Sequence, residues 1–277
     1  MEVRYSLLLK KSLHDFKKNP VLLLPLVFTI FIGIFLFLIF FTQVIVFGYL
    51  NLSYETNLIK FIILLLIFIF IDIILLILSG ALINSMYFGL LHAIITKKEA
   101  LVKDMWNGAS KFTILYSKFY LVKLLLFVVP ISVLALLIFI GFLISKGTGI
   151  VFAFIFGAVL ILYLLALWLL FTFGFLFFAP IMTKSRTNSV ILLIKESLKY
   201  TRENLGHAVL TWLIVFVISL TITIANQILG FLIKVLPSIS LVFVILTILL
   251  TVFAVLLIIW LKIFLFNSYF NYNLKNL

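Results

Sequence analysis

The sequence predicts an all-α integral membrane protein, a bundle of six transmembrane helices arranged as three hairpins. Each hairpin is expected to follow an amphipathic helix at the membrane interface. The composition supports this class, because 66% of the 277 residues are hydrophobic and only 10% are charged. Soluble domains are about half apolar and about a quarter charged. A soluble fold of this size could not bury so many apolar side chains, so much of the surface must face lipid.

Six apolar segments are long enough to cross a bilayer, which requires about 20 residues. In chain order we expect the spans within Val21–Leu50, Leu58–Ile95, Leu121–Ser145, Ile150–Met182, Ala208–Leu236 and Leu241–Phe266. Three connections are short, and we interpret them as turns within hairpins: Asn51–Asn57, Lys146–Gly149 and Pro237–Ser240. The remaining connections are long and charged.

The positive charges lie mostly on one side of this arrangement. Eighteen Lys and Arg residues fall in the N-terminal segment, the long connections and the C-terminal end, and only Lys60, Lys146 and Lys234 fall on the other side. Because positive loops are retained in the cytoplasm, the long segments and both termini are predicted to be cytoplasmic. The expected location is the cell membrane.

The charged segments resemble one another. Leu7–Leu13 and Leu192–Leu198 match without a gap at an offset of 185 residues, and the offset continues to Asn19 and Asn204. A middle segment beginning at Leu101 matches more weakly. We interpret residues 1–277 as one membrane domain with pseudo-repeats of about 1–96, 97–183 and 184–277, each an interfacial helix followed by a hairpin.

The matching segments have the pattern of amphipathic helices. Apolar side chains recur at helical spacing, and basic side chains occupy a neighbouring arc, a pattern typical of helices that lie in the headgroup region. Each basic residue near an anionic surface contributes about 1 kcal/mol. The basic residues predicted to face lipid headgroups are Lys10, Lys17, Lys195, Lys199 and Arg202. The alternative is a cytoplasmic helix that packs on its neighbours.

Short motifs suggest a family. The run Phe178–Ile181, followed by Ser197-Leu198, Thr201-Arg202 and Asn204–Gly206, resembles the membrane domain associated with glycerophosphodiester phosphodiesterases. It also resembles related prokaryotic six-span families of unknown function. Gly80–Leu82 through Lys103–Gly108 is similar to the corresponding earlier element. The resemblance implies a six-span membrane domain without catalysis, since in such enzymes the phosphodiesterase barrel is a separate soluble domain.

Polar side chains within the spans form the candidate intramembrane site. Asp72 is the only acidic residue within a predicted span, and an ionisable group inside a membrane is by default a functional hypothesis. It would act either as a proton or cation site or as a hydrogen-bonded contact between helices. The other members of the candidate site are Gln43, Asn84, Asn226 and Gln227.

Other chemistry is not indicated. The chain contains no cysteine, and its three histidines have no carboxylate or second histidine at ligand spacing, so no metal site or cofactor is predicted. No catalytic motif is visible. The charge of +13 is better explained by topology and anionic lipid than by nucleic acid. The sequence therefore favours a non-enzymatic membrane scaffold or accessory subunit with a possible membrane protein partner. The alternative is a small proton- or ion-coupled transporter that uses Asp72.

Overall fold

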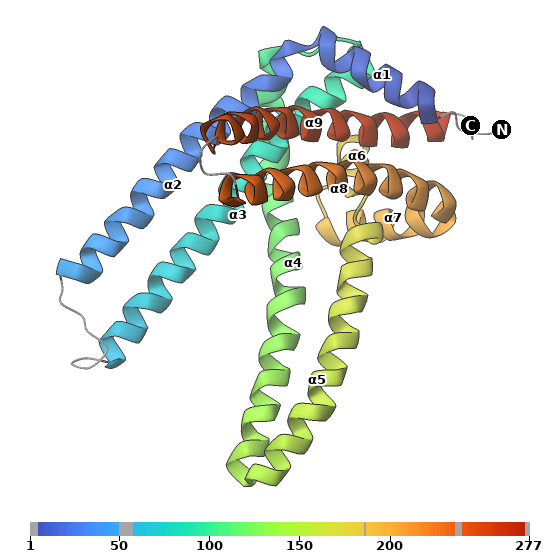
Figure 1. Ribbon diagram of the computed structural model, residues 1–277. Helices are drawn as coiled ribbons and strands as arrows, with labels where there is room; N and C mark the ends of the chain where they lie inside the picture. The colour runs from blue at the N-terminus through green and yellow to red at the C-terminus, as the bar shows by residue number, and fades with distance from the viewer. Residues whose placement is uncertain (1–4, 50–57, 186, 236–239, 275–277) are drawn as a thin grey trace. The chain divides into compact units, whose positions relative to one another are not determined.

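The computed structural model describes residues 5–49, 58–185, 187–235 and 240–274, and within them regular structure is helical throughout (Figure 1). The elements in chain order are α1 (Tyr5–Lys18), η1 (Pro20–Leu23), α2 (Leu24–Tyr49), α3 (Leu58–Lys97), α4 (Val102–Ile144), α5 (Lys146–Leu169), η2 (Leu170–Gly174), α6 (Phe178–Lys184), α7 (Val190–Glu203), α8 (Leu205–Val235) and α9 (Ser240–Leu274). The all-α prediction is confirmed.

Six helices are long and apolar enough to cross a membrane, as predicted. They cover Pro20–Gly48, Ile59–Lys97, Val102–Ile144, Lys146–Gly174, Leu205–Val235 and Leu241–Asn271. At most 11% of the most apolar window of any span is buried inside the protein. Exposed apolar surface of this extent is stable only against hydrocarbon, so the spans require a bilayer.

The fourth span ends earlier than the predicted Ile150–Met182. Helix α5 continues into the π-helical turn η2, and the helix is then interrupted before α6 begins at Phe178. Pro180 lies in the first turn of α6, where a missing backbone N–H is tolerated. The apolar composition of this stretch hides the interruption from a hydropathy pattern.

The predicted turn Lys146–Gly149 is instead the first turn of α5. Ser145 is the N-cap of α5, and its side chain accepts a hydrogen bond of 3.0 Å from the backbone N–H of Thr148. A serine in this role begins a helix at once, so the connection between α4 and α5 is shorter than expected. The predicted turn at 51–57 and most of the one at 237–240 lie outside the described residues.

Separate amphipathic helices precede two of the three hairpins. Helices α1 and α7 each have 14 residues, and their bounds differ by the same 185 residues that relate their sequences. The middle segment differs, because α4 runs without interruption from Val102 to Ile144. Gly108 does not end a helix there; it allows close packing against Gly89 of α3.

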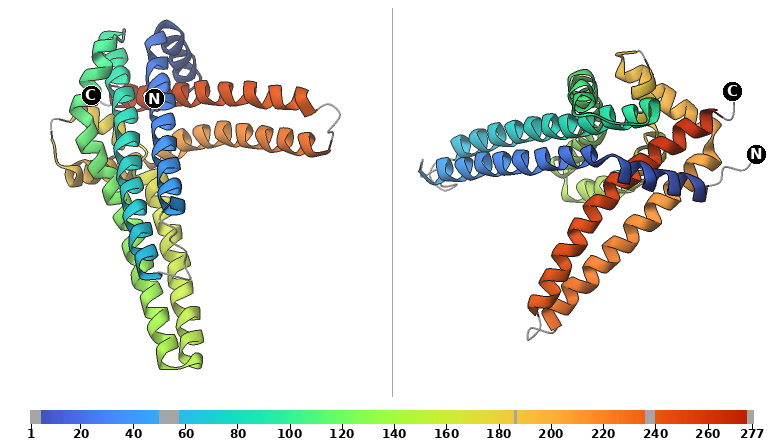
Figure 2. Two further views of the ribbon diagram at one scale, coloured as in Figure 1. Left: turned by 90° about the vertical axis from the view of Figure 1, so that its left-hand side faces the viewer. Right: turned by 90° about the horizontal axis from the view of Figure 1, so that it is seen from above.

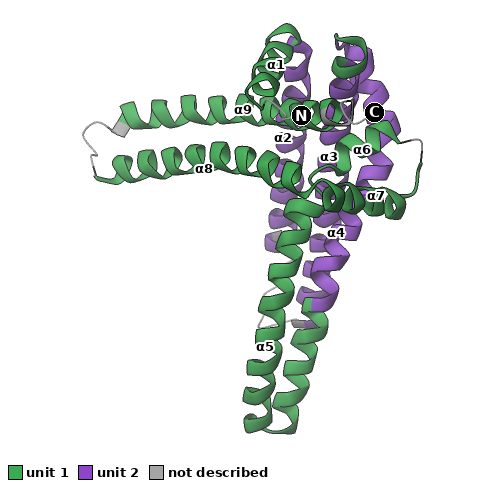
Figure 3. Ribbon diagram, turned by 90° about the vertical axis from the view of Figure 1, so that its right-hand side faces the viewer, with its two compact units in different colours: residues 1–19, 94–98, 131–277 green, residues 20–93, 99–130 purple. Residues whose placement is uncertain are grey.

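The described chain divides into two compact units (Figure 3). One unit contains residues 1–19, 94–98 and 131–277, and the other contains residues 20–93 and 99–130. Within the first unit α8 and α9 run side by side as a hairpin (Figure 2), α1 packs on α9, and α7 packs on α6 and η2. Within the second unit α3 packs on the first part of α4.

Candidate functional site: the interfacial helices and the intramembrane polar pair

Helix α1 is tied to span ends at both of its own ends. Its last residue, Lys18, lies directly before the span that begins at Pro20. Near its other end the hydroxyl of Tyr5 forms a hydrogen bond of 2.8 Å with Nδ1 of His207, the third residue of α8. A helix of this length measures about 21 Å. Helix α1 is therefore bonded at its first turn to the beginning of α8.

One face of α1 is held on α9 by polar contacts. Ser12 is fully buried, donates a hydrogen bond of 2.8 Å to the Leu8 carbonyl, and accepts one of 3.2 Å from Nδ2 of Asn267. The same Nδ2 donates a hydrogen bond of 3.0 Å to the carboxylate of Asp15. Leu8 adds a buried apolar contact on this face. A single asparagine of α9 thus binds two positions of α1.

Lys11 belongs to the packed side of α1. Its ammonium group donates a hydrogen bond of 3.1 Å to Oδ1 of Asn271. Burial lowers the pKa of Lys11, nearby Lys98 lowers it further, and Asp15 opposes both effects. Lys11 is therefore a contact within the protein.

His207 is the centre of a buried chain of hydrogen bonds that the sequence did not reveal. Its Nε2 lies 3.1 Å from the Ser268 hydroxyl, which lies 3.0 Å from the Thr211 hydroxyl. The ring of Phe177 stacks on the imidazole with centroids 5.6 Å apart. A neutral imidazole offers one donor and one acceptor, so both ring nitrogens of His207 are satisfied by hydroxyl groups, those of Ser268 and Tyr5.

Helix α7 is bound differently, to main-chain carbonyl groups of η2. The Ser197 hydroxyl donates a hydrogen bond of 2.7 Å to the Gly174 carbonyl, and the Thr201 hydroxyl donates one of 3.0 Å to the Phe173 carbonyl. Both side chains are buried. The Phe173 carbonyl also accepts a hydrogen bond of 3.3 Å from the backbone N–H of Leu176, so Thr201 adds a second donor to it. Helix α7 thus supplies donors to both carbonyl groups at the end of the fourth span.

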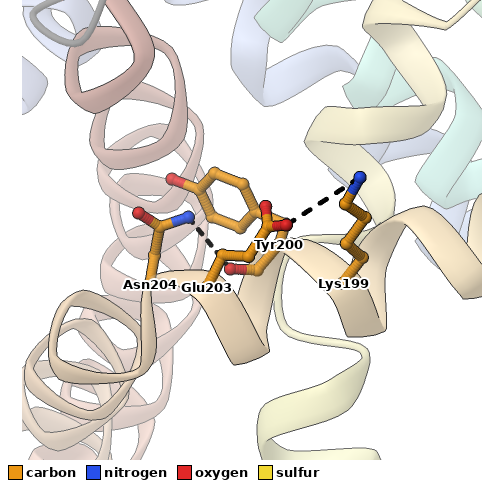
Figure 4. A network of polar contacts seen from close by, with 4 residues as sticks. All are labelled: Lys199, Tyr200, Glu203 and Asn204. Atoms are coloured by element: carbon orange, nitrogen blue, oxygen red, sulfur yellow. Dashed lines mark hydrogen bonds and ion pairs between the residues drawn. The ribbon is translucent and has the colours of Figure 1, made fainter.

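All five basic residues predicted to face headgroups are exposed in the structure: Lys10, Lys17, Lys195, Lys199 and Arg202. Figure 4 shows Lys199 paired with Glu203 at 3.8 Å along the exposed side of α7. The amide of Asn204 caps the same helix by donating a hydrogen bond of 3.0 Å to the Tyr200 carbonyl. The exposed faces of α1 and α7 are therefore accessible to headgroups.

Asp72 pairs with Gln43 across the first hairpin. Nε2 of Gln43 donates a hydrogen bond of 2.9 Å to Oδ1 of Asp72, which joins α2 to α3. A groove of about 400 Å³ passes Gln43 and is lined mainly by hydrocarbon: Phe35, Leu38, Ile39, Thr42, Gln43, Val46, Phe68 and Ile71. The Thr42 hydroxyl is bonded to its own helix. Asp72 does not line this groove.

Within the same unit, Asn84 lies apart from the pair formed by Asp72 and Gln43. Asn84 follows Asp72 by 12 residues on the same helix, about 18 Å along the axis. Asn84 donates hydrogen bonds of 2.8 Å to the Gly80 carbonyl and 3.1 Å to the hydroxyl of Tyr120 on α4. In the other unit, Asn226 is half-buried and Gln227 is exposed, both on α8.

Comparison with sequence profiles of known families, with curated proteins and with solved structures finds no match to the chain. Among the residues that the structure describes, no group of three or more His, Cys, Asp or Glu is placed to hold a metal ion. The functional interpretation therefore depends on the geometry of the hydrogen-bonded contacts and the exposed basic faces.

Proposed function

We propose that the chain is a non-enzymatic scaffold or accessory subunit of the cell membrane, with both termini cytoplasmic. The observation that carries this proposal is that buried polar side chains of α1, α8 and α9 bind one another between these helices. Asn267 binds Ser12 and Asp15, and His207 binds Tyr5 and Ser268. Side chains used in this way hold helices together, and their polar atoms have hydrogen-bond partners within the protein.

The pair formed by Gln43 and Asp72 supports the same proposal. A carboxyl group that accepts a hydrogen bond from a neighbouring span acts as a contact between helices. Its separation from Asn84 argues against one polar path along α3. The main alternative is a proton- or ion-coupled transporter that depends on Asp72, and it makes a different experimental prediction.

The interfacial helices supply the proposed lipid contact. We place the exposed faces of α1 and α7 against lipid headgroups, because both helices are bonded to the ends of spans. The resemblance to membrane domains that accompany a separate catalytic domain supports a role beside a membrane protein partner.

The test is to reconstitute the purified protein in liposomes and to compare it with Asp72→Asn and Asp72→Leu. We expect wild-type flux of protons and monovalent cations to equal that of empty liposomes. Asn still accepts the Gln43 hydrogen bond, so Asp72→Asn should retain most of the stability. Asp72→Leu removes the acceptor for Gln43 and should lower the free energy of unfolding, measured at equilibrium, by about 1–3 kcal/mol. Wild-type flux that Asp72→Asn abolishes would overturn the scaffold and establish the transporter.

A further inference from the structure

We propose that α1 is a docking surface selective for anionic phospholipid headgroups, whereas α7 meets the interface without charge selectivity. The inference rests on the proposed placement of both helices at headgroup level, and it names the lipid class that one of them binds. It comes from comparing two helices that share a register but differ at two charged positions.

The two helices carry the same basic face. On α1 the exposed residues Lys10, Leu13, His14 and Lys17 have spacings i, i+3, i+4 and i+7, and therefore lie on one side of the helix. At the offset of 185 residues α7 presents its own exposed set in the same positions: Lys195, Leu198, Lys199 and Arg202. Each face combines basic groups with an exposed leucine, as interfacial helices do.

The charged residues beside this face differ in sign between α1 and α7. Glu196 and Glu203 of α7 occupy the positions of Lys11 and Lys18 of α1. Helix α7 therefore has three basic residues against two glutamates, whereas α1 has four lysines against one aspartate. Glu203 pairs with Lys199 at 3.8 Å, and both side chains are more than half exposed. The glutamates thus offset part of the basic charge that α7 presents.

The single acid of α1 does not offset its basic face in this way. Asp15 accepts a hydrogen bond from Asn267 on the packed side of the helix. Lys10, His14 and Lys17 lie on the exposed side. The basic face of α1 is therefore a coherent positive surface.

Phospholipid is the partner that this surface fits best. Tyr5 bonds to His207 at the beginning of α8, so at the proposed headgroup level the basic face of α1 lies among phosphate groups. Leu13 is 44% exposed between the basic residues and would reach the acyl boundary. Helix α7 exposes Ile191 where α1 has Ser6, whereas Leu192 and its counterpart Leu7 are both exposed; the additional apolar side chain suits α7 to uncharged lipid.

The chain offers a matched pair of probe positions. It contains no cysteine, so Ser6→Cys and Ile191→Cys each introduce one label site, at exposed positions related by the same offset. The full-length protein, labelled with bimane, is reconstituted in bilayers of phosphatidylcholine and phosphatidylglycerol. Bromine is placed on the acyl chains of one lipid or the other, and the quenching ratio reports the local enrichment of phosphatidylglycerol.

We expect brominated phosphatidylglycerol to quench the Ser6→Cys probe several-fold more strongly than brominated phosphatidylcholine. Lys10→Gln and Lys17→Gln should each lower the ratio toward one, and high salt should also lower it. The Ile191→Cys probe should show a ratio near one. Equal quenching at Ser6→Cys, or an equal preference at both probes, would overturn the proposal.

A second variant keeps the test decisive if the lysine variants fail to fold. Glu196→Gln with Glu203→Gln removes only exposed acids and should raise the phosphatidylglycerol preference at Ile191→Cys toward that at Ser6→Cys. An unchanged ratio would contradict the charge-balance explanation. The quenching experiment does not depend on ion flux. A negative result for lipid selectivity at α1 is therefore distinguishable from a negative result for the proposed scaffold function.

Discussion

At the scale of single residues, two glycines decide how closely α3 and α4 approach. A Cβ atom on Gly89 would overlap the Asp104 carbonyl and lie 2.7 Å from the Gly108 Cα. Small residues at helix contacts are typical of membrane proteins, where close backbone packing supplies much of the association energy. The two glycines explain how closely this part of α4 packs on α3.

We predict that Gly89→Ala will destabilise the protein by about 1–3 kcal/mol, because the methyl group must push α3 and α4 apart. Equilibrium unfolding in mixed micelles measures the change. Gly33→Ala is the matched control, since a Cβ atom at Gly33 meets no atom within 4 Å. Equal stability of the two variants would contradict the close contact.

At the scale of elements, α7 stabilises the interrupted end of the fourth span. Ser197 donates to the Gly174 carbonyl, which would otherwise be costly to bury. Thr201 adds a second donor to the Phe173 carbonyl, which already accepts from the backbone N–H of Leu176. The equivalent serine of α1, Ser12, instead accepts from the side chain of Asn267 on an unbroken helix. The two matching helices are thus held by different partners: α7 by main-chain carbonyl groups of η2, and α1 by a side chain of α9.

We expect the double variant Ser197→Ala/Thr201→Val to loosen η2. Amide hydrogen exchange in residues 170–177 should accelerate, and each lost hydrogen bond to a buried carbonyl should cost about 1–3 kcal/mol. Thr223→Val serves as control, because its exposed hydroxyl bonds only to its own helix. If residues 170–177 exchange at the same rate in the double variant as in the Thr223→Val control, α7 does not support the turn.

At the scale of the whole molecule, contacts distant in sequence join the first helix to the last. Asn267 bonds to Ser12 and Asp15 across more than 250 residues of chain. Closing a loop of this length costs conformational entropy, which the contacts between α1 and α9 must offset. They also fix the side of α1 that stays exposed.

A double-mutant cycle on Asp15→Ala and Asn267→Ala should give a coupling energy of about 0.5–3 kcal/mol, because the two side chains are in direct contact. Asn267→Ala alone should be the more damaging single change, since it also removes the partner of Ser12. Asn188→Ala, at an exposed position, should have little effect. Additive single effects would indicate that Asp15 and Asn267 do not interact.

The sequence by itself determined the helical class, the six spans and the amphipathic pattern of α1 and α7, because these follow from local hydrophobic periodicity and length. It also identified Asp72 and the exposed basic residues. Only the tertiary structure revealed the partner of each polar group: Gln43 for Asp72, Tyr120 for Asn84, and hydroxyl groups for His207. The physical reason is that a hydrogen bond between helices depends on the rotation and depth of both helices. Those quantities are set by packing between distant segments, which leaves no periodic signal in the sequence.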